Sequence, residues 1–548
     1  MTVGPGPSTL ADFIRQAAAS HPDADAVVLA GSRISYSQLL SGATTWSLRL
    51  VALGVRPGEH VGLLLPNSTE FMQVLFGVAL AGAVSVPMNS RYRGPEIAAT
   101  VADADLVAII TTCAAEGHPS FTERLREAFP DLATQADSRH LALVPAPKLR
   151  SIIALDSAVE PGLLRASEIS AAAGSTAELE ARRLTVQPGD TGIILYTSGS
   201  TSRPKGCLLS HAALLAQGQL MAGRYNMTAN DRIWSPVPMF HVGGISPFIA
   251  IASVGGAFLS MPRIEPGAGL ALMAAERATI CYVLFQTIIT DILQHPHFES
   301  FDLSEVRLVI SNLALQPSWI AELLAKRMPQ AIQIGTYGMT ETVGAACTHS
   351  PNDESADRLG RLGRPLPGVG VRIIDESGND RPLGAIGEVL LRGPTSCHGY
   401  YRDAEKTASS FMDGWLLTGD LGSLDTGGSI MFHGRLKDVL KVGGENVGAL
   451  EVEAVIGDHP AVKGCAVTGM AHSRLVEVPV VFVELAPGKT ATEQDILEFC
   501  VGKLASFKLP RRAFFLTEWP MSSTKIDKPA LRLRVAQLVE SDKPSEIH

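Results

Sequence analysis

A run of hydroxyl side chains, glycines and one lysine at residues 196–206 has the chemistry of a phosphate-binding loop. The run reads YTSGSTSRPKG and follows the apolar residues 193–195, which predict a strand that leads into the loop. Hydroxyl and backbone N–H groups donate hydrogen bonds to phosphate oxygens, and Lys205 can neutralise their charge. Because a Walker A loop requires Gly where this chain has Pro204, the run is a phosphate loop of another kind or an ordinary Ser/Thr/Gly turn.

Four polar segments further along the chain add other groups that nucleotide chemistry requires. Residues 337–342 read YGMTET, and Glu341 between two threonines could hold a magnesium ion that bridges phosphates. Residues 417–420 read LTGD and place a carboxylate just after an apolar strand end, where it suits a ribose diol. Residues 434–446 contain GRLKD and GGEN, and residues 522–528 read SSTKIDK. Each segment alone is better explained as a cap, an ion pair, a turn or a solvated charge, but their joint occurrence in this order indicates one site.

The order of these motifs resembles that of the adenylate-forming superfamily, which includes acyl-CoA synthetases, peptide-synthetase adenylation domains and beetle luciferases. The resemblance extends over most of the chain, from about residue 10 to about residue 535. It implies two half-reactions. A carboxylate attacks the α-phosphate of ATP to give an acyl-AMP and pyrophosphate; a small C-terminal domain then swings, and a thiol attacks the acyl-AMP. The implied ligands are ATP, or an acyl-AMP taken directly as substrate, together with CoA and Mg²⁺.

The resemblance also implies roles for the residues that match the nucleotide motifs. The β- and γ-phosphates would be held by Thr197, Ser198, Gly199, Ser200, Thr201 and Lys205. Glu341 would bind magnesium, and Thr340 would bind the α-phosphate. The adenine and ribose would contact Tyr337, Asp420 and Arg435.

Other roles implied by the resemblance concern the lysines and glycines near the C-terminus. Lys525 would bridge the carboxylate and the α-phosphate and offset charge as pentacoordinate phosphorus forms. Lys437 occupies the position of the hinge residue. The pantetheine tunnel would be lined by Lys441, Gly443 and Gly444, where a larger side chain than glycine would block the ligand.

Residues 238–244, PMFHVGG, resemble the corresponding stretch of acyl-CoA synthetases. Peptide-synthetase domains usually carry an Asp there to hold an amino group, and its absence favours a non-amino carboxylic acid with CoA as the acceptor. His241 would border the acyl pocket or be a buried, hydrogen-bonded histidine. The other expected pocket residues are mostly apolar, which predicts an apolar acid: Phe240, Val242, Phe285, Leu313, Gly338 and Met339.

Three departures from the superfamily pattern fall on the adenylating machinery. Ser202 replaces a glycine, Asn312-Leu313 replaces a small pair that faces the adenine, and Thr524 precedes Lys525 where a glycine is usual. The last change leaves the loop from Pro520 one residue short, and one residue spans up to ~3.5 Å. A misplacement of ~1 Å can reduce a rate on the order of 10²-fold.

Three functional hypotheses follow from these departures. The first is a complete acyl-CoA ligase that tolerates the changes. The second is an enzyme that adenylates poorly or not at all and converts a preformed acyl-AMP, supplied by a separate adenylating enzyme, into acyl-CoA. The third, a non-catalytic acyl-AMP-binding or nucleotide-binding relative, is disfavoured because the chain retains Lys525, Glu341, Asp420 and the tunnel glycines.

The composition excludes several other classes of protein. Of 548 residues, 46% are apolar and 18% charged, which indicates a globular chain, and a net charge of −9 argues against nucleic-acid binding. Seven scattered cysteines without a CxxC pair, and an N-terminus without a signal-peptide pattern, predict a cytoplasmic protein. Residues 235–262 lack charged side chains, but four prolines and four glycines favour a buried core over a membrane span.

The distribution of apolar runs predicts an α/β fold. Short apolar runs such as 60–65 and 280–285 between helical patterns predict mostly parallel sheets covered by helices, followed after residue 370 by a small β-barrel-like region. By the resemblance, residues 1–434 form an acyl- and AMP-binding domain, residues 435–437 a hinge, and residues 438–548 a mobile α+β domain. The weakly patterned residues 114–185 predict insertions or mobile loops, and a homodimer is plausible by resemblance only.

Overall fold

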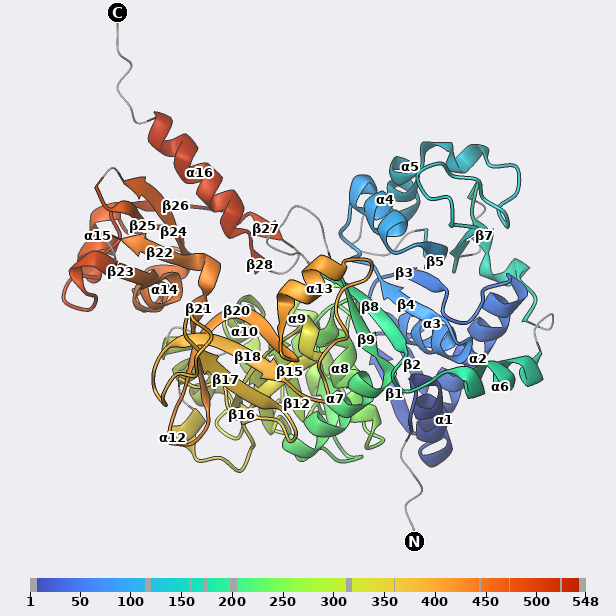
Figure 1. Ribbon diagram of the computed structural model, residues 1–548. Coiled ribbons are helices and arrows are strands. Elements are labelled where there is room, and N and C mark those ends of the chain that lie inside the picture. Colours follow the sequence, from blue (N-terminus) through green and yellow to red (C-terminus); the bar gives the residue numbers. More distant parts are fainter. Residues whose placement is uncertain are drawn as a thin grey trace, which may run out of the picture.

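The computed structural model describes residues 7–113, 120–156, 160–171, 175–197, 205–311, 318–358, 360–442, 445–472, 474–522 and 525–541. Figure 1 shows two large helix-covered sheets, a smaller antiparallel sheet and a separate C-terminal domain. This arrangement confirms the predicted α/β fold class.

A seven-stranded sheet carries the two strands that flank the phosphate loop at one edge. The strand order is β7-β6-β5-β3-β4-β8-β9, and every pairing is parallel except that of β8 with β9. The strands are β3 (His60–Leu64), β4 (Val84–Pro87), β5 (Leu106–Thr111), β6 (Ser151–Ala154), β7 (Leu164–Arg165), β8 (Thr191–Thr197) and β9 (Lys205–Ser210). Helices of the same part of the chain are α2 (Tyr36–Ala52), α3 (Thr69–Leu80), α4 (Gly94–Asp103), α5 (Phe121–Ala128) and α6 (Thr176–Thr185).

A nine-stranded sheet carries the YGMTET segment. Its order is β16-β15-β14-β13-β12-β10-β11-β1-β2, with a parallel centre from β14 to β1 and antiparallel edges. The strands are β1 (Asp25–Leu29), β2 (Ser32–Ser35), β10 (Arg232–Trp234), β11 (Ala257–Leu259), β12 (Ile280–Leu284), β13 (Leu308–Ser311), β14 (Ile332–Met339), β15 (Gly344–Thr348) and β16 (Arg364–Pro365). Associated helices are α1 (Leu10–Ser20), α7 (His211–Arg224), α8 (Val242–Ala252), α9 (Pro266–Ala275), α10 (Gln286–Leu293), α11 (Ser318–Arg327) and α12 (Ser355–Arg358).

The main core lies between these two sheets. It combines buried side chains of α1, α2, α3, α7 and α8 with inward-facing residues of both sheets, such as Ile193 and Tyr282. Serine caps begin several of the core helices: the side chains of Ser35, Ser68 and Ser210 accept hydrogen bonds from the first turns of α2, α3 and α7. The strands are apolar on successive residues because both faces of each sheet are covered.

The predicted antiparallel region is a five-stranded curled sheet. Its strands are β17 (Gly370–Ile374), β18 (Gly387–Arg392), β19 (Phe411–Met412), β20 (Trp415–Leu424) and β21 (Ile430–Arg435), with helix α13 (Ala404–Ser410) before β19. One detail of the prediction was wrong. Asp420 was expected just after a strand end, but it lies inside β20, because residues 420–424 continue the strand by pairing with β21 and place Asp420 opposite Arg435.

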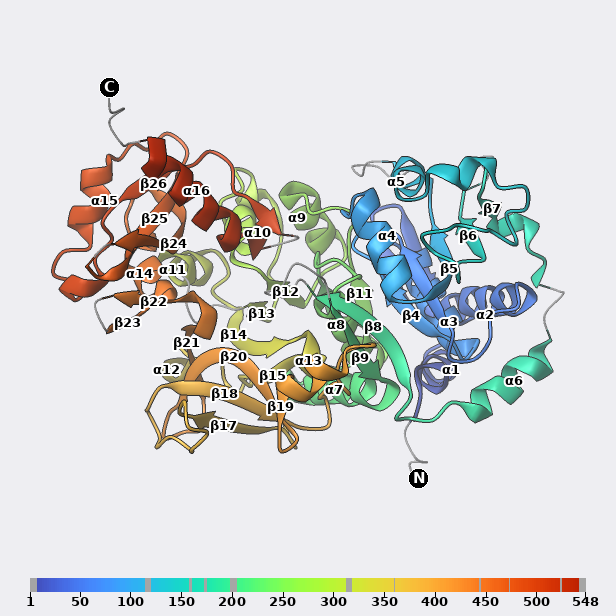
Figure 2. The same ribbon diagram turned by 45° about the horizontal axis from the view of Figure 1, so that its top comes forward.

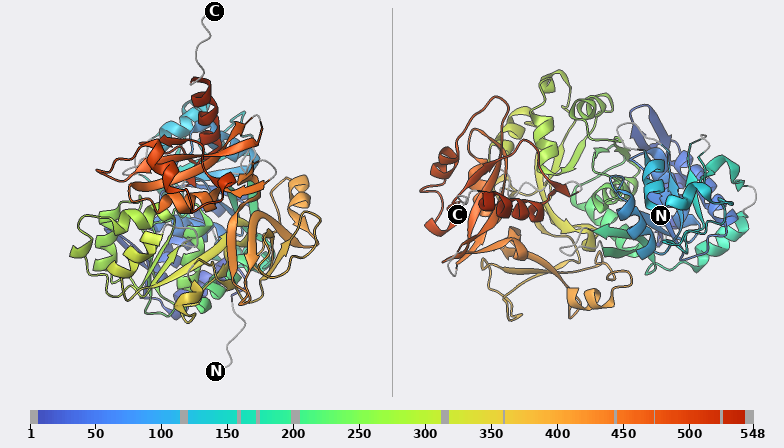
Figure 3. Two further views of the ribbon diagram at one scale, coloured as in Figure 1. Left: turned by 90° about the vertical axis from the view of Figure 1, so that its left-hand side faces the viewer. Right: turned by 90° about the horizontal axis from the view of Figure 1, so that it is seen from above.

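The chain beyond β21 forms a domain with buried clusters of its own. A 3₁₀ turn, Leu436–Asp438, connects β21 to a sheet of β22 (Val439–Val442), β23 (Glu445–Gly448), β24 (Val462–His472), β25 (Val476–Leu485) and β26 (Ala513–Phe515). The helices are α14 (Ala449–Gly457), α15 (Glu493–Phe499) and α16 (Lys528–Ser541). The hairpin β27 (Met521–Ser522) and β28 (Lys525–Ile526) points from this domain toward the middle of the molecule (Figures 2 and 3).

Two further expectations are settled by the described residues. The described parts of 114–185 are not simply loops, because β6 and β7 extend the seven-stranded sheet and Phe121, Leu125 and Ile152 belong to a buried cluster. The uncharged stretch 235–262 forms α8, β11 and their connections. Within the described ranges, no helix has the length and apolarity needed to span a bilayer.

Candidate active site

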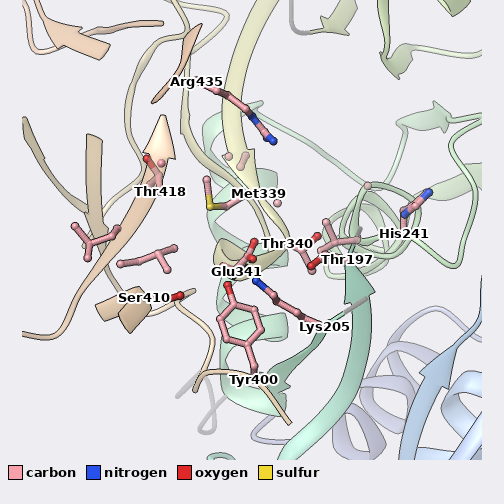
Figure 4. A pocket seen from close by; sticks show the side chains of 18 of the residues that line it. Thr197, Lys205, His241, Met339, Thr340, Glu341, Tyr400, Ser410, Thr418 and Arg435 are labelled. Atoms are coloured by element: carbon pink, nitrogen blue, oxygen red, sulfur yellow. Dashed lines mark hydrogen bonds between the residues drawn. The ribbon is translucent and has the colours of Figure 1, made fainter. Parts of the chain in front are cut away.

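A cavity of about 660 Å³ lies where β8, β9 and β14 meet the curled sheet and the turn at residues 436–438 (Figure 4). Eleven of the predicted site residues line it: Thr197, Lys205, His241, Val242, Phe285, Gly338, Met339, Thr340, Glu341, Arg435 and Lys437. Segments that are up to about 240 residues apart in sequence therefore contribute to one concave surface.

Other predicted site residues lie behind the cavity lining or elsewhere. Tyr337 and Asp420 are buried directly behind it, and the ring of Phe240 packs against that of His241 with centroids 4.6 Å apart. Lys441 lies on β22 of the C-terminal domain, where its backbone N–H donates to Glu477 over 2.6 Å. Lys525 begins β28. The predicted residues Ser198, Gly199, Ser200, Thr201, Leu313, Gly443 and Gly444 are outside the described ranges.

Lys205, Glu341 and Tyr400 form the charged end of the cavity, and Figure 4 shows their polar atoms pointing toward one another. The Tyr400 hydroxyl donates to Glu341 Oε1 over 2.8 Å, and Lys205 Nζ lies 6.0 Å from the centre of the Tyr400 ring. Burial, followed by the positive charge of Lys406, lowers the pKa of Lys205. Burial and the Glu341 carboxylate raise the pKa of Tyr400, so this phenol remains a hydrogen-bond donor at neutral pH.

Backbone pairing between β9 and residues 397–401 fixes this cluster. Leu208 N–H donates to Gly399 O over 2.9 Å, and Tyr401 N–H donates to Gly206 O over 2.8 Å. On the other side, Cys397 N–H donates to Glu341 O over 2.7 Å. Residues 397–401 thus hold β9, the strand that follows the phosphate loop, next to Glu341, which follows β14.

The buried carboxylate of Asp420 organises the opposite side of the site. It accepts a hydrogen bond of 3.0 Å from the Tyr337 hydroxyl and lies 3.3 Å from Arg435 Nε. Burial and the Asp420 charge raise the pKa of Tyr337, which keeps the phenol protonated. Glu388, which accepts from Gly419 N–H over 3.0 Å, also lines the cavity, and burial raises its pKa.

Two residues near the cavity hold the left-handed backbone conformation that non-glycine residues rarely adopt. Leu284, a lining residue at the end of β12, has φ 52°, and Val343, directly after the 3₁₀ turn of Thr340–Thr342, has φ 55°. For a β-branched residue such as Val343 this conformation is an outlier. Strain of this kind persists only where the surrounding structure enforces it, which is common at functional sites.

Sequence reasoning missed several residues that line the cavity. They come from the curled sheet, α13, β12, β14 and the connecting residues 397–401: Tyr282, Thr336, Glu388, Tyr400, Lys406, Ser409 and Ser410. Tyr400 and Glu388 belong to no motif with a recognisable spacing. Their positions depend on pairings between distant strands, which a local pattern does not encode.

The charged end of the cavity is chemically suited to magnesium held partly by phosphates. Glu341 offers a carboxylate, and Thr197 and Thr340 offer hydroxyl oxygens, which are the ligand types that magnesium prefers. Among the described residues, no three His, Cys, Asp or Glu side chains lie together in a group that could hold a metal by themselves. Magnesium is commonly bound by one or two carboxylates together with substrate phosphates, and Glu341 provides one such carboxylate here.

Comparison with known proteins gives matches over nearly the whole chain. Residues 14–401 match the family model described as AMP-binding enzyme, and residues 451–525 match its C-terminal domain. The putative acyl-CoA synthetase YngI of Bacillus subtilis is 31% identical over 97% of this chain and 98% of its own. The indoleacetate–CoA ligase of Aromatoleum aromaticum is 30% identical over 96% of this chain and 98% of its own.

The fold comparison agrees with the sequence comparison. The crystal structure of the anthranilate CoA ligase AuaEII, in complex with anthranoyl-AMP, has a TM-score of 0.84 at 26% identity and covers 98% of this chain and 99% of that one. Together with the cavity geometry, these matches establish that the chain belongs to the AMP-binding, adenylate-forming superfamily and is an acid–thiol ligase of the acyl-CoA synthetase type.

Proposed function

We propose that this enzyme forms the CoA thioester of a largely apolar carboxylic acid through an acyl-adenylate, using ATP and magnesium. The observation that carries the proposal is that one cavity joins three chemically distinct regions. These are the Lys205–Glu341 cluster, the Arg435 side that is backed by Asp420, and an apolar wall that includes Phe285 and Met339. Such a cavity suits an acyl group attached to a nucleotide phosphate.

In the first half-reaction, Lys205 would neutralise the pyrophosphate that leaves, and Thr340 would hydrogen-bond to the α-phosphate. Magnesium bound at Glu341 would neutralise the negative charge of the phosphate oxygens. Asp420 would bind the ribose hydroxyls, and its bonds to Tyr337 and Arg435 would keep the carboxylate oriented. Lys525 would stabilise the charge that develops between the carboxylate and the α-phosphate.

The second half-reaction would require the C-terminal domain to rotate about Lys437. Lys437 lies in the turn between β21 and β22, lines the cavity, and accepts a hydrogen bond of 3.3 Å on its carbonyl from Arg532 of α16. In Figure 1 the β27–β28 hairpin points toward the middle of the molecule, whereas Lys441 belongs to β22 in the sheet of the C-terminal domain. Rotation would exchange the two and bring Lys441 with Gly443 and Gly444 to the thiol.

A panel of carboxylic acids tests the proposal with the purified enzyme. Pyrophosphate release with ATP and magnesium reports the first half-reaction, and thioester formation from the matching synthetic acyl-AMPs and CoA reports the second. We expect both activities for at least one apolar acid. Thioester formation without pyrophosphate release would instead identify an enzyme that depends on a separate adenylating enzyme, and acyl-AMP binding without either activity would identify a binding protein.

Inserting Gly between Thr524 and Lys525 is expected to raise the rate of pyrophosphate release by about 10-fold or more. The insertion restores the length of the loop that leads to β28, and a ~1 Å error at the reacting atoms can account for an effect of this size or larger. Thioester formation from synthetic acyl-AMP should not change. A matched insertion of Gly after Gly488, in the exposed turn before α15, is the control. No gain from the first insertion would show that the short loop does not limit adenylation.

Replacing Tyr400 by Phe is expected to raise the magnesium concentration at half-maximal activity about 10-fold. The hydroxyl fixes one oxygen of Glu341, and an oriented ligand loses affinity when its supporting hydrogen bond is removed. The measurement is a magnesium titration of pyrophosphate release, together with magnesium-dependent ATP binding by calorimetry. Tyr401→Phe is the control, because that hydroxyl donates to Asp105, away from Glu341. Equal magnesium dependence in wild type and Tyr400→Phe would contradict this role.

A further inference from the structure

Leu284, at the end of β12, holds a backbone conformation that its side chain disfavours. Its φ of 52° lies in the left-handed region, and Phe285 N–H donates to Val283 O over 2.5 Å, so that Leu284 is the central residue of a tight three-residue turn. Turns of this kind with a positive φ are rare and strained, whereas glycine would adopt the same φ without a steric penalty. A leucine in this place therefore indicates that its side chain has a function.

The turn directs two successive side chains toward the cavity. In a regular strand, successive side chains point to opposite faces of the sheet, yet Leu284 and Phe285 both line the cavity. The pairing of β12 with β13 also shifts by one residue between Tyr282 and Leu284, as in a β-bulge. Bulges beside active sites commonly re-aim a side chain. The strand end is therefore shaped to present Leu284 to the cavity.

The tip of Leu284 lies against bare backbone on the facing wall. A Cβ atom added at Gly243, in the first turn of α8, would be 2.9 Å from Leu284 Cδ1 and 3.2 Å from Val237 Cγ1. Because carbon atoms pack at about 3.5–4.0 Å, the space between Leu284 and the helix cannot hold even a methyl group. All three residues line the cavity, and we call Val237, Gly243 and Leu284 the acyl stop.

The acyl stop is on the side of the cavity away from the ribose-binding residues. Figure 4 shows His241, which directly precedes α8, and Thr418 on opposite sides of Thr340. Thr418 is two residues before Asp420 on β20. An acyl-adenylate with its ribose at Asp420 and its phosphate at Thr340 therefore directs its acyl group toward α8 and the acyl stop.

From this geometry we infer that Leu284 sets the largest acyl group that the enzyme accepts, so that the preferred acids are compact rather than long-chain. The inference rests on the proposed function and narrows its substrate class from apolar acids to those that fit between Thr340 and the acyl stop. A longer acid would have to displace the Leu284 side chain, which the turn holds against α8. Overfilling a packed apolar wall is unfavourable.

Straight-chain acids from butanoate to dodecanoate test the inference with the wild-type, Leu284→Ala and Leu284→Gly enzymes. We expect kcat/KM of the wild type to fall steeply beyond one chain length. Both variants should move this limit to longer acids by about two carbon atoms or more, because they remove most of the side chain that forms it. They should raise kcat/KM of the first excluded acid about 10-fold or more, which is what one methylene group in an apolar pocket can contribute. A limit that neither variant moves, or a wild type without a limit, would overturn the inference.

Gly243→Ala tests the contact between Leu284 and α8 from the other side. The added methyl group should lower kcat/KM of the longest accepted acid about 10-fold, because Leu284 must move into the cavity to make room for it. Combined with Leu284→Ala, the same substitution should have little effect, because the closest atom that the methyl group would meet is gone. Independent, additive effects would show that the two residues do not form one wall and would overturn the inference.

Leu293→Ala is the matched control for loss of packing. Leu293 ends α10, is fully buried and does not line the cavity. Its replacement should lower the melting temperature without moving the chain-length limit, and a moved limit would count against the specific role of Leu284. Leu284→Gly should melt at a higher temperature than Leu284→Ala, because glycine alone accepts a φ of 52° without strain. The reverse order would show that the strained turn is not held in solution and would overturn the inference.

Binding of unreactive acyl-adenylate mimics separates failure of this inference from failure of the proposed function. Sulfamoyladenosine analogues with acyl groups of the same chain lengths are compared by the thermal shift that each produces in the wild-type and Leu284→Gly enzymes. Larger shifts for short analogues in the wild type, with a gain for long ones in Leu284→Gly, support the inference even if no acid is converted, in which case only the proposed function fails. The same dependence on chain length in both proteins would overturn the inference whatever the activity.

Discussion

Replacing Lys525 by Ala should reduce pyrophosphate release by about 10³-fold while leaving thioester formation from synthetic acyl-AMP within about 3-fold of wild type. Removing one group that stabilises developing charge typically lowers a rate by about 10²–10³-fold, and Lys525 carries a full charge. The effect should be confined to the first half-reaction because Lys525 begins β28 of a two-stranded hairpin, whereas Lys441 lies on β22 of the separate five-stranded sheet. Measuring pyrophosphate release and thioester formation on this one variant therefore shows whether the two half-reactions use different conformations of the enzyme.

Lys528→Ala is the matched control for this experiment. Lys528 lies three residues further along, at the start of α16, and its ammonium group donates to Glu453 Oε1 over 2.7 Å inside the C-terminal domain. Its loss should lower the stability of that domain and change pyrophosphate release only slightly. If Lys525→Ala retained wild-type adenylation, Lys525 would have no part in the first step.

Asp420→Ala should reduce both half-reactions by about 10² to 10³-fold and raise the KM for ATP. The carboxylate is 4% exposed, and its removal deprives the Tyr337 hydroxyl and the Arg435 guanidinium of a common partner. Breaking a buried charged network also destabilises a fold, commonly by a few kcal/mol. ATP and acyl-AMP both contain the ribose that Asp420 would bind, so we expect both half-reactions to slow.

Asp420→Asn and Asp425→Ala distinguish nucleotide binding from folding. Asp420→Asn keeps the size and one acceptor oxygen, so it should fold while still weakening ATP binding. Asp425, in the turn between β20 and β21, pairs with Arg361 at 2.6 Å and is not a cavity residue. Its replacement should lower the melting temperature without raising the KM for ATP. Unchanged KM in folded Asp420→Asn would contradict the ribose-binding role.

The parts of the fold that follow from local patterns were predictable from the sequence. The runs at 60–65 and 280–285 form β3 and β12 to within one residue. Buried parallel strands leave continuous apolar runs, which are visible without a structure. The weakly patterned residues 114–185 were harder, because β6 and β7 are short strands at the edge of a sheet.

The parts of the site that depend on distant pairings were not predictable. Tyr400 reaches Glu341 only because residues 397–401 pair with β9, nearly 200 residues earlier in the chain. The position of Asp420 within β20 likewise depends on its partner strand β21. The cavity lining likewise combines Tyr282 of β12 with Thr336 of β14, and no spacing in the sequence connects them.

The most direct test of the account is a single-turnover experiment with CoA omitted. Enzyme, ATP, magnesium and an apolar carboxylic acid from the panel are mixed, quenched and analysed by mass spectrometry for enzyme-bound acyl-AMP, and CoA is then added to a second aliquot. The account predicts acyl-AMP and pyrophosphate before CoA, and acyl-CoA with AMP after it. ADP and phosphate as products, or formation of thioester only from acyl-AMP supplied from outside, would contradict the proposal that this enzyme completes both half-reactions.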